Sequence, residues 1–295
     1  MNQKNRVSSI LILSLFFGVA SGVIRAQEQP EPKKQEVKQE VKQDVKIEPA
    51  PKVPKRVKHR FEFLYMWEFL FPKAEYGKPW KSMYLHYYGF PSATFNYFAH
   101  FGTVYREGKN DYIGIIGSAR DWTPWFYTYA AVAMGTVADY MPKFRYDLDL
   151  NFKWLKNKSL VWTLGIASIK YHQVGQDLVL SSGLTLHLPK WVMEYRLFRN
   201  RSNPGNVRSW THLGSIGYGA EKKCWTYFTF SKGSLAYLAL YINTPEEIRQ
   251  SAINLSAIHR QWVTKNLGFW VELDYVKLKE VYDKLGVFAG LFWEL

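Results

Sequence analysis

The sequence predicts an all-β fold, an antiparallel transmembrane β-barrel, and three observations lead to this prediction. An N-terminal segment of the secretory type comes first, followed by a low-complexity tail. The aromatic residues, 12 Trp, 20 Tyr and 19 Phe, all lie beyond residue 60 except Phe16 and Phe17. From there on, segments of about 10–14 residues with alternating apolar and polar positions follow one another, separated by turn residues.

Residues 1–26 have the layout of a signal peptide. A basic start precedes the apolar residues 10–19, and small residues follow, which predicts cleavage after Gly22 or Ala26. The apolar run has about ten residues, whereas a membrane-spanning helix needs about 20. The segment therefore predicts export through a cleaved signal peptide, with an uncleaved anchor as the alternative.

Residues 27–60 contain no aromatic residue and are rich in Lys, Glu and Pro. Three tandem copies of Gln-acid-Val-Lys occupy residues 35–46. Because this segment has too little apolar surface to offset the loss of chain entropy, we expect a disordered periplasmic tail. It would be a solvated spacer, or it would contact peptidoglycan or a periplasmic protein.

Residues 61–295 are expected to form the barrel, and residues 144–154 show the alternation most clearly. A strand separates alternate residues onto two faces, whereas a helix would scatter both sets. One face of this segment carries Phe144, Tyr146, Leu148, Leu150, Phe152 and Trp154, and the other carries Arg145, Asp147, Asp149, Asn151 and Lys153. A transmembrane barrel turns the first kind of face to lipid and the second to its interior.

Repetition of this pattern predicts about fourteen strands, with twelve as the alternative. An even number would return both chain ends to the periplasm. Residues 235–242 are apolar enough to form a strand of their own, which would disturb the count. The predicted strands cover residues 61–72, 79–89, 92–106, 110–119, 124–138, 143–155, 159–172, 176–187, 190–200, 206–219, 222–233, 248–263, 267–279 and 283–295.

The composition excludes some functions. The formal net charge is +14, yet no basic block is interleaved with aromatic residues in a nucleic-acid-binding motif, so nucleic acid is not an expected partner. Cys224 is the one cysteine, which excludes an intramolecular disulfide and a multi-thiolate metal site. We expect no metal site and no cofactor.

The charged residues on the polar faces are the candidates for a functional interior. Both signs occur on the same predicted wall, which fits either a network of salt bridges that fills the barrel or a polar channel that selects ions, sugars or anionic glycan. A barrel of twelve to fourteen strands lies between filled eight-stranded barrels and open porins of about 16–18 strands, so a plugged or narrow pore is expected. The candidates are Arg106, Arg145, Asp147, Asp149, Lys153, Glu194, Arg196, Arg260, Glu272 and Asp274.

A catalytic role has weak support. Ser82 and His100 occupy positions on adjacent predicted strands that would face the interior. They are the candidates for a nucleophile and its base. Many Ser and His residues would face the interior of a barrel of this size, and none of the sequence motifs of hydrolases, zinc proteases or nucleotide-binding proteins occurs.

Three motifs follow one another in the barrel region: MPKFRYDLDLNFKWL at residues 141–155, SKGS at residues 231–234 and the closing GVFAGLFWEL. In this order they resemble the YaiO family of outer-membrane β-barrel proteins. The resemblance implies an outer-membrane barrel and no reaction. Barrels of this kind typically end in an aromatic residue read by the barrel assembly machinery, whereas this chain ends in Leu295, so Phe292 or Trp293 would take that part.

Three functions remain open at this point. The first is an outer-membrane barrel with a structural or narrow-channel role, linked to surface glycan or envelope upkeep. The second is a barrel enzyme that modifies lipid or acyl groups, and the third is a soluble secreted β-protein that binds an apolar ligand. The first places the chain in a Gram-negative outer membrane, in contact with its lipid and lipopolysaccharide and with both termini in the periplasm.

Overall fold

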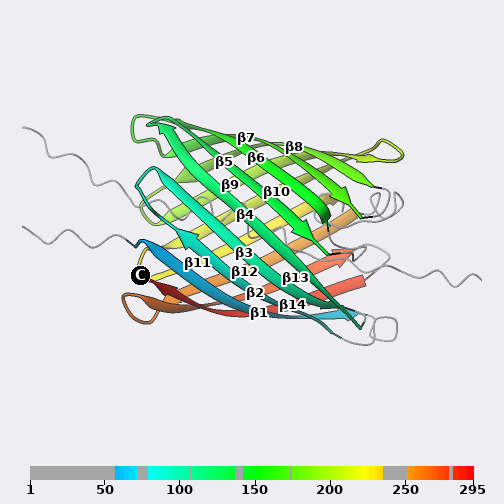
Figure 1. Ribbon diagram of the computed structural model, residues 1–295. Coiled ribbons are helices and arrows are strands. Elements are labelled where there is room, and N and C mark those ends of the chain that lie inside the picture. The colour runs from blue at the N-terminus through cyan, green and yellow to red at the C-terminus, as the bar shows by residue number, and fades with distance from the viewer. Residues whose placement is uncertain are drawn as a thin grey trace, which may run out of the picture.

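The computed structural model describes residues 57–71, 79–106, 108–136, 142–172, 175–234, 251–278 and 282–295. These residues form a closed antiparallel barrel (Figure 1). Its strands are β1 (His59–Phe71), β2 (Trp80–Gly89), β3 (Phe95–Arg106), β4 (Lys109–Thr123), β5 (Phe126–Gly135), β6 (Pro142–Trp154), β7 (Leu160–Tyr171), β8 (Gln176–His187), β9 (Trp191–Asn203), β10 (Val207–Ala220), β11 (Cys224–Ser234), β12 (Ser251–Trp262), β13 (Leu267–Leu278) and β14 (Tyr282–Glu294).

The predicted all-β barrel of fourteen strands is confirmed, and the alternative of twelve is wrong. The predicted signal peptide, the tail as far as residue 56 and residues 235–242 lie outside the described residues. No helix in the described part of the chain is long and apolar enough to span a membrane.

Each strand pairs with its neighbours in the chain, and β1 pairs with β14 to close the barrel. The register of this closing pair runs from Arg60 opposite Glu294 to Phe71 opposite Asp283. Beyond it, the amide of Lys58 donates a hydrogen bond of 2.7 Å to the carbonyl of Leu295. The start of β1 and the end of β14 therefore lie at the same end of the barrel, which we call the terminal end (Figure 1).

The alternation in the sequence becomes an outer and an inner surface. On β1, Phe63 and Trp67 are 47% and 42% exposed, whereas Leu64 and Met66 between them are fully buried. Successive side chains of a strand point to opposite faces, so every strand contributes to both surfaces. Large apolar side chains are exposed on all fourteen strands. A soluble barrel keeps its apolar face inside, so the interpretation as a soluble ligand-binding protein is wrong.

Exposed aromatic side chains gather near both ends of the barrel. Aromatic rings at such positions sit at the boundary between lipid and water, and two girdles mark the two edges of the apolar band in outer-membrane barrels. Near the terminal end lie Trp122, Trp125, Trp154, Trp191 and Trp293, and near the opposite end lie Trp67, Tyr112 and Trp210.

The connections differ between the two ends. At the terminal end they comprise residues 90–94, 124–125, 155–159, 188–190, 221–223 and 263–266, and all are short. The longest connection, residues 235–250, joins β11 to β12 and leaves from the opposite end. Some boundaries were predicted wrongly: β3 begins at Phe95 rather than at residue 92, and β9 ends at Asn203 rather than at residue 200. The largest difference is at the end of β4, because residues 120–123 belong to this strand rather than to a link. A β-bulge between Asp121 and Thr123 absorbs the extra residue, and the turn is confined to residues 124–125.

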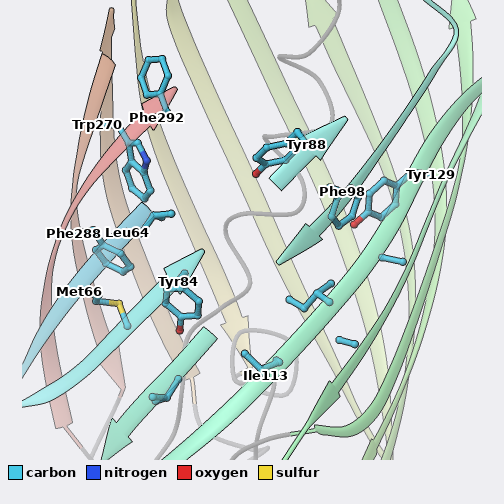
Figure 2. Close-up of a cluster of buried hydrophobic side chains, with 14 of the residues drawn as sticks. Leu64, Met66, Tyr84, Tyr88, Phe98, Ile113, Tyr129, Trp270, Phe288 and Phe292 are labelled. Carbon is cyan, nitrogen blue, oxygen red and sulfur yellow. The ribbon is translucent and has the colours of Figure 1, made fainter. Parts of the chain in front are cut away.

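The interior holds many apolar side chains. Figure 2 shows Leu64, Trp270 and Phe288 on one side of the interior, with Phe98 and Tyr129 across from them. These apolar side chains reduce the space inside the barrel. They occupy inward positions, where open porins carry polar residues.

Candidate functional site

The ten charged residues predicted to face the interior all lie on inward positions of their strands. They differ in how deeply they are buried. Arg106, Arg145, Glu272 and Asp274 are buried, and Asp147, Asp149, Lys153, Glu194, Arg196 and Arg260 are half-buried.

Near the terminal end, Glu294 of β14 has three partners. It forms an ion pair with Arg60 of β1 and another with Lys222 in the β10–β11 turn, and it accepts a hydrogen bond of 3.1 Å from the indole of Trp262. Glu294 is 1% exposed. Several donors are needed to keep a carboxylate ionised at such a depth, and these three residues supply them.

The same end contains two further acids. Glu62 on β1 receives a hydrogen bond of 2.9 Å from Arg260 of β12, and Glu221 in the β10–β11 turn lies 3.6 Å from Arg60. Partial removal from water raises the pKa of Glu221, whose side chain is 50% exposed, although the guanidinium of Arg60 acts in the opposite direction. The charges at this end therefore connect β1, β12, β14 and the β10–β11 turn.

On β6 and β9, a two-pronged ion pair crosses two intervening strands. Arg196 donates to both carboxylate oxygens of Asp149, at 2.6 and 3.1 Å, and also to the hydroxyl of Ser181 on β8. Gly165 of β7 lies directly beneath, and a β-carbon there would overlap with Asp149, Arg196 and Ser181. The missing side chain of Gly165 is what permits this close approach.

Two more ion pairs lie on the same part of the wall. Arg145 donates to Asp147 at 2.7 Å, and Lys153 lies 3.0 Å from Asp121 of β4. Glu194 on β9 is half-buried beside this group. We call Asp121, Asp147, Asp149, Lys153, Glu194 and Arg196 the solvated wall, because most of these side chains keep part of their surface exposed inside the barrel.

Far from the terminal end, Glu68 of β1 forms the third cluster. Its carboxylate pairs with Lys284 of β14 and, at 3.4 Å, with Arg106 of β3. The guanidinium of Arg106 lies 3.9 Å from the centre of the Trp80 ring, a cation–π contact. All four side chains are at most 1% exposed, so this part of the interior is closed to solvent.

The structure does not bring Ser82 and His100 together. Ser82 lies opposite Val104, whereas His100 lies opposite His86, with ring centres 3.9 Å apart. The step of four residues from His100 to Val104 on β3 corresponds to a separation of roughly 14 Å along the strand. A nucleophile and its base need hydrogen-bond distance, so this geometry gives no support to catalysis by the pair.

No three His, Cys, Asp or Glu side chains of the described segments group as the ligands of a metal ion. The prediction missed Arg60, Glu62, Glu68, Lys284 and Glu294, which are essential members of the clusters. The alternation of β1 would have identified the first three. Glu294 and Lys284 pair with Arg60 and Glu68, which lie more than 200 residues away in the chain, so no local pattern reveals these contacts.

Comparisons with solved structures show the same fold. The outer-membrane protein Omp33 of Acinetobacter baumannii aligns with a TM-score of 0.50 and 10% identity, over 81% of this chain and 99% of its own. The monoaromatic hydrocarbon channel CymD aligns with a TM-score of 0.55 and 7% identity, over 82% and 89%. The toluene transporter TodX of P. putida aligns with a TM-score of 0.52 and 7% identity, over 81% and 90%. At such identities the likeness concerns the fold alone.

Among curated proteins, none matches this sequence. A family model does match: that of the YaiO membrane β-barrel domain, over residues 58–238. The match covers more than half of the chain and, together with the closed barrel and its apolar outer surface, places the protein in the outer membrane. The chain belongs to the family of the YaiO membrane β-barrel domain.

Proposed function

We propose that this barrel is a narrow channel for small hydrophilic solutes and that it prefers cations. The observation that carries the proposal is the solvated wall. The side chains of Asp121 and Asp149 are 21% and 20% exposed, although both point into the barrel. Glu68 and Lys284 across the interior are fully buried. A polar path along β4, β6 and β9 beside a packed wall at β1 and β14 is the arrangement expected of a narrow pore.

The number of strands supports a narrow pore rather than a wide one. Fourteen strands lie between the filled eight-stranded barrels and the porins of roughly 16–18 strands, whose lumen is open. The inward rings of Tyr88, Phe98 and Trp270 take up part of the cross-section (Figure 2). Solutes larger than hydrated ions or small metabolites would therefore be excluded.

The preference for cations follows from the charges that the described strands turn inward. Among the buried and half-buried inward positions there are eleven acids and seven bases, a difference of four negative charges, although the whole chain carries +14. The exposed Lys109 at the edge of β4 would reduce the difference to three. The acids are Glu62, Glu68, Asp111, Asp121, Asp147, Asp149, Asp177, Glu194, Glu272, Asp274 and Glu294, and the bases are Arg60, Arg106, Arg145, Lys153, Arg196, Arg260 and Lys284. Rings of acidic side chains favour cations in other channels.

The proposed orientation places the terminal end in the periplasm. All connections at that end are short, and the longest connection, residues 235–250, leaves from the other end. Outer-membrane barrels have short periplasmic turns and longer external loops. The tail before β1 would then lie in the periplasm, where contact with peptidoglycan or a periplasmic protein is open to it.

Electrical recording from purified protein in a planar lipid bilayer tests the proposal. We expect small, discrete conductance steps from the wild-type protein. The change Asp149→Asn removes one negative charge from the solvated wall and should lower the preference for cations. The change Asp283→Asn is the matched control, because Asp283 occupies an outward position near the start of β14 and accepts a hydrogen bond from Tyr275. A properly folded wild-type barrel that gives no conductance steps would contradict the channel.

A further inference from the structure

The inner surface of β13 carries two acids that the ion-pair clusters leave unsatisfied. Glu272 and Asp274 are two residues apart, both point inward, and each is 1% exposed. Asp274 interacts electrostatically with Asn254 and Lys284, yet neither of its oxygens accepts a hydrogen bond of normal geometry. The same is true of Oε2 of Glu272. Buried carboxylate oxygens without donors are costly, so such a carboxyl group is neutralised either by a proton or by a positively charged partner.

A third oxygen points to the same place. Ser256 on β12 lies directly opposite Asp274 in the strand register. Directly opposed side chains of antiparallel strands have β-carbons about 4.5–5.5 Å apart. The hydroxyl of Ser256 is buried, with the residue 6% exposed, and it has no hydrogen-bond partner. Ser256 is neutral, so its unsatisfied hydroxyl is evidence independent of the two acids.

A glycine lies next to these two acids on the neighbouring strand. Gly286 of β14 lies opposite Asp274 on one side and opposite Glu68 of β1 on the other. No side chain therefore separates the two carboxylates along this row of the inner surface. A β-carbon at Gly286 would lie 3.0 Å from the Phe288 ring and 3.4 Å from the β-carbon of Asp274.

The local charges do not balance. Three carboxylates, of Glu68, Glu272 and Asp274, share two cationic side chains, Arg106 and Lys284. Both cations already pair with Glu68. When all three carboxyl groups are ionised, one negative charge is left over in a region that is closed to solvent. A single positive charge would neutralise it, whereas a divalent ion would leave an excess.

We propose that Glu272, Asp274 and Ser256 bind one monovalent cation, Na⁺ or K⁺, at the inner surface between β12 and β13. All of the donors are oxygens, which is the ligand type that hard cations require. The site lies away from the solvated wall and does not depend on the proposed channel. It can therefore be tested on the folded barrel in detergent, without any measurement of conductance.

The experiment measures the apparent thermal unfolding temperature of the full-length barrel at constant ionic strength. Sodium chloride or potassium chloride replaces N-methyl-D-glucamine chloride, whose cation is too large for the site. A ligand that binds the folded state raises this temperature in a saturable way. We expect a saturable rise on the order of a few degrees in the wild-type protein.

The double variant Glu272→Gln with Asp274→Asn distinguishes binding from a purely structural role. It should unfold at the wild-type temperature or higher in N-methyl-D-glucamine, because the surplus buried charge is gone, and it should lose the response to Na⁺ and K⁺. Asp283→Asn removes an outward acid from the neighbouring strand and should keep the full response. A wild-type barrel that does not respond to Na⁺ or K⁺, or that responds to Ca²⁺ alone, would overturn the proposal, as would an unchanged response in the double variant.

Discussion

Asp149 and Arg196 form an ion pair across two intervening strands, from β6 to β9, with an oxygen–nitrogen distance of 2.6 Å. Gly165 on β7 lies beneath this pair, and its lack of a side chain makes the contact possible. The absence of a side chain at Gly165 thus allows Asp149 and Arg196 to pair, although β6 and β9 are not neighbouring strands. The same pair belongs to the solvated wall, so the packing of the barrel and its proposed selectivity depend on the same residues.

The change Gly165→Ala should displace this ion pair and lower the free energy of unfolding by about 1 kcal/mol or less, because the atoms that the new carbon meets are the ends of flexible, partly exposed side chains that can move aside. The added carbon would overlap with Asp149, Arg196 and Ser181. Urea unfolding in lipid vesicles, followed by Trp fluorescence, gives the free energy of unfolding.

Gly114→Ala on β4 is the control, because a β-carbon there would have no heavy atom within 4 Å. Its free energy of unfolding should be close to that of the wild-type protein. Equal effects of the two substitutions would show that Gly165 is not needed for the close approach.

Phe228 tests which surface of the barrel faces lipid. It lies in the middle of β11 and is 58% exposed. Phe228→Arg should lower the free energy of unfolding by about 2–4 kcal/mol, the cost of an arginine near the middle of the bilayer. Tyr218→Arg, close to the β10–β11 turn, should cost at most about 1 kcal/mol, because lipid gives way to water there. A reversed order of the two effects would contradict the membrane placement.

Glu221 makes the stability of the terminal end depend on pH. Its pKa in the folded barrel is raised, mainly through removal from water, so the folded state binds this proton more tightly than the unfolded state does. The stabilising contribution of the protonated side chain is therefore complete below the unfolded-state pKa and is lost as the pH rises through the folded-state pKa.

Glu221→Gln keeps the side chain neutral at every pH. The difference in free energy of unfolding between variant and wild type should be small in acid and should grow in favour of the variant towards neutral pH. Denaturant titrations between about pH 4 and 7 measure it. A difference that does not change with pH, or that grows in favour of the wild type, would contradict the raised pKa.

The alternating pattern was sufficient to predict the number of strands and most of their boundaries. Residues 144–154 already separated lipid-facing from inward-facing side chains, because a strand has a repeat of two. The end of β4 was misplaced, since the bulge at Asp121 interrupts this repeat and no local signal marks it.

The candidate site was predictable in part. The inward parity of Asp149 and Arg196 is visible in the sequence, but their pairing is not, because it depends on tilt and register across β7 and β8. The same is true of Arg60 and Glu294, which are 234 residues apart and become neighbours only when the barrel closes. Inward aromatic residues such as Tyr88 and Phe98 resemble lipid-facing ones in the sequence, so the partly filled interior could not be predicted from composition.

The reversal potential of the wild-type protein in a planar bilayer, under a tenfold gradient of potassium chloride, tests the central claim most directly. The excess of inward acids over inward bases predicts discrete conductance steps and a reversal potential with the sign of potassium selectivity, which weakens at high salt as the charges are screened. A reversal potential of the opposite sign, or one at zero, would contradict the preference for cations, and a folded barrel without any conductance would contradict the channel itself.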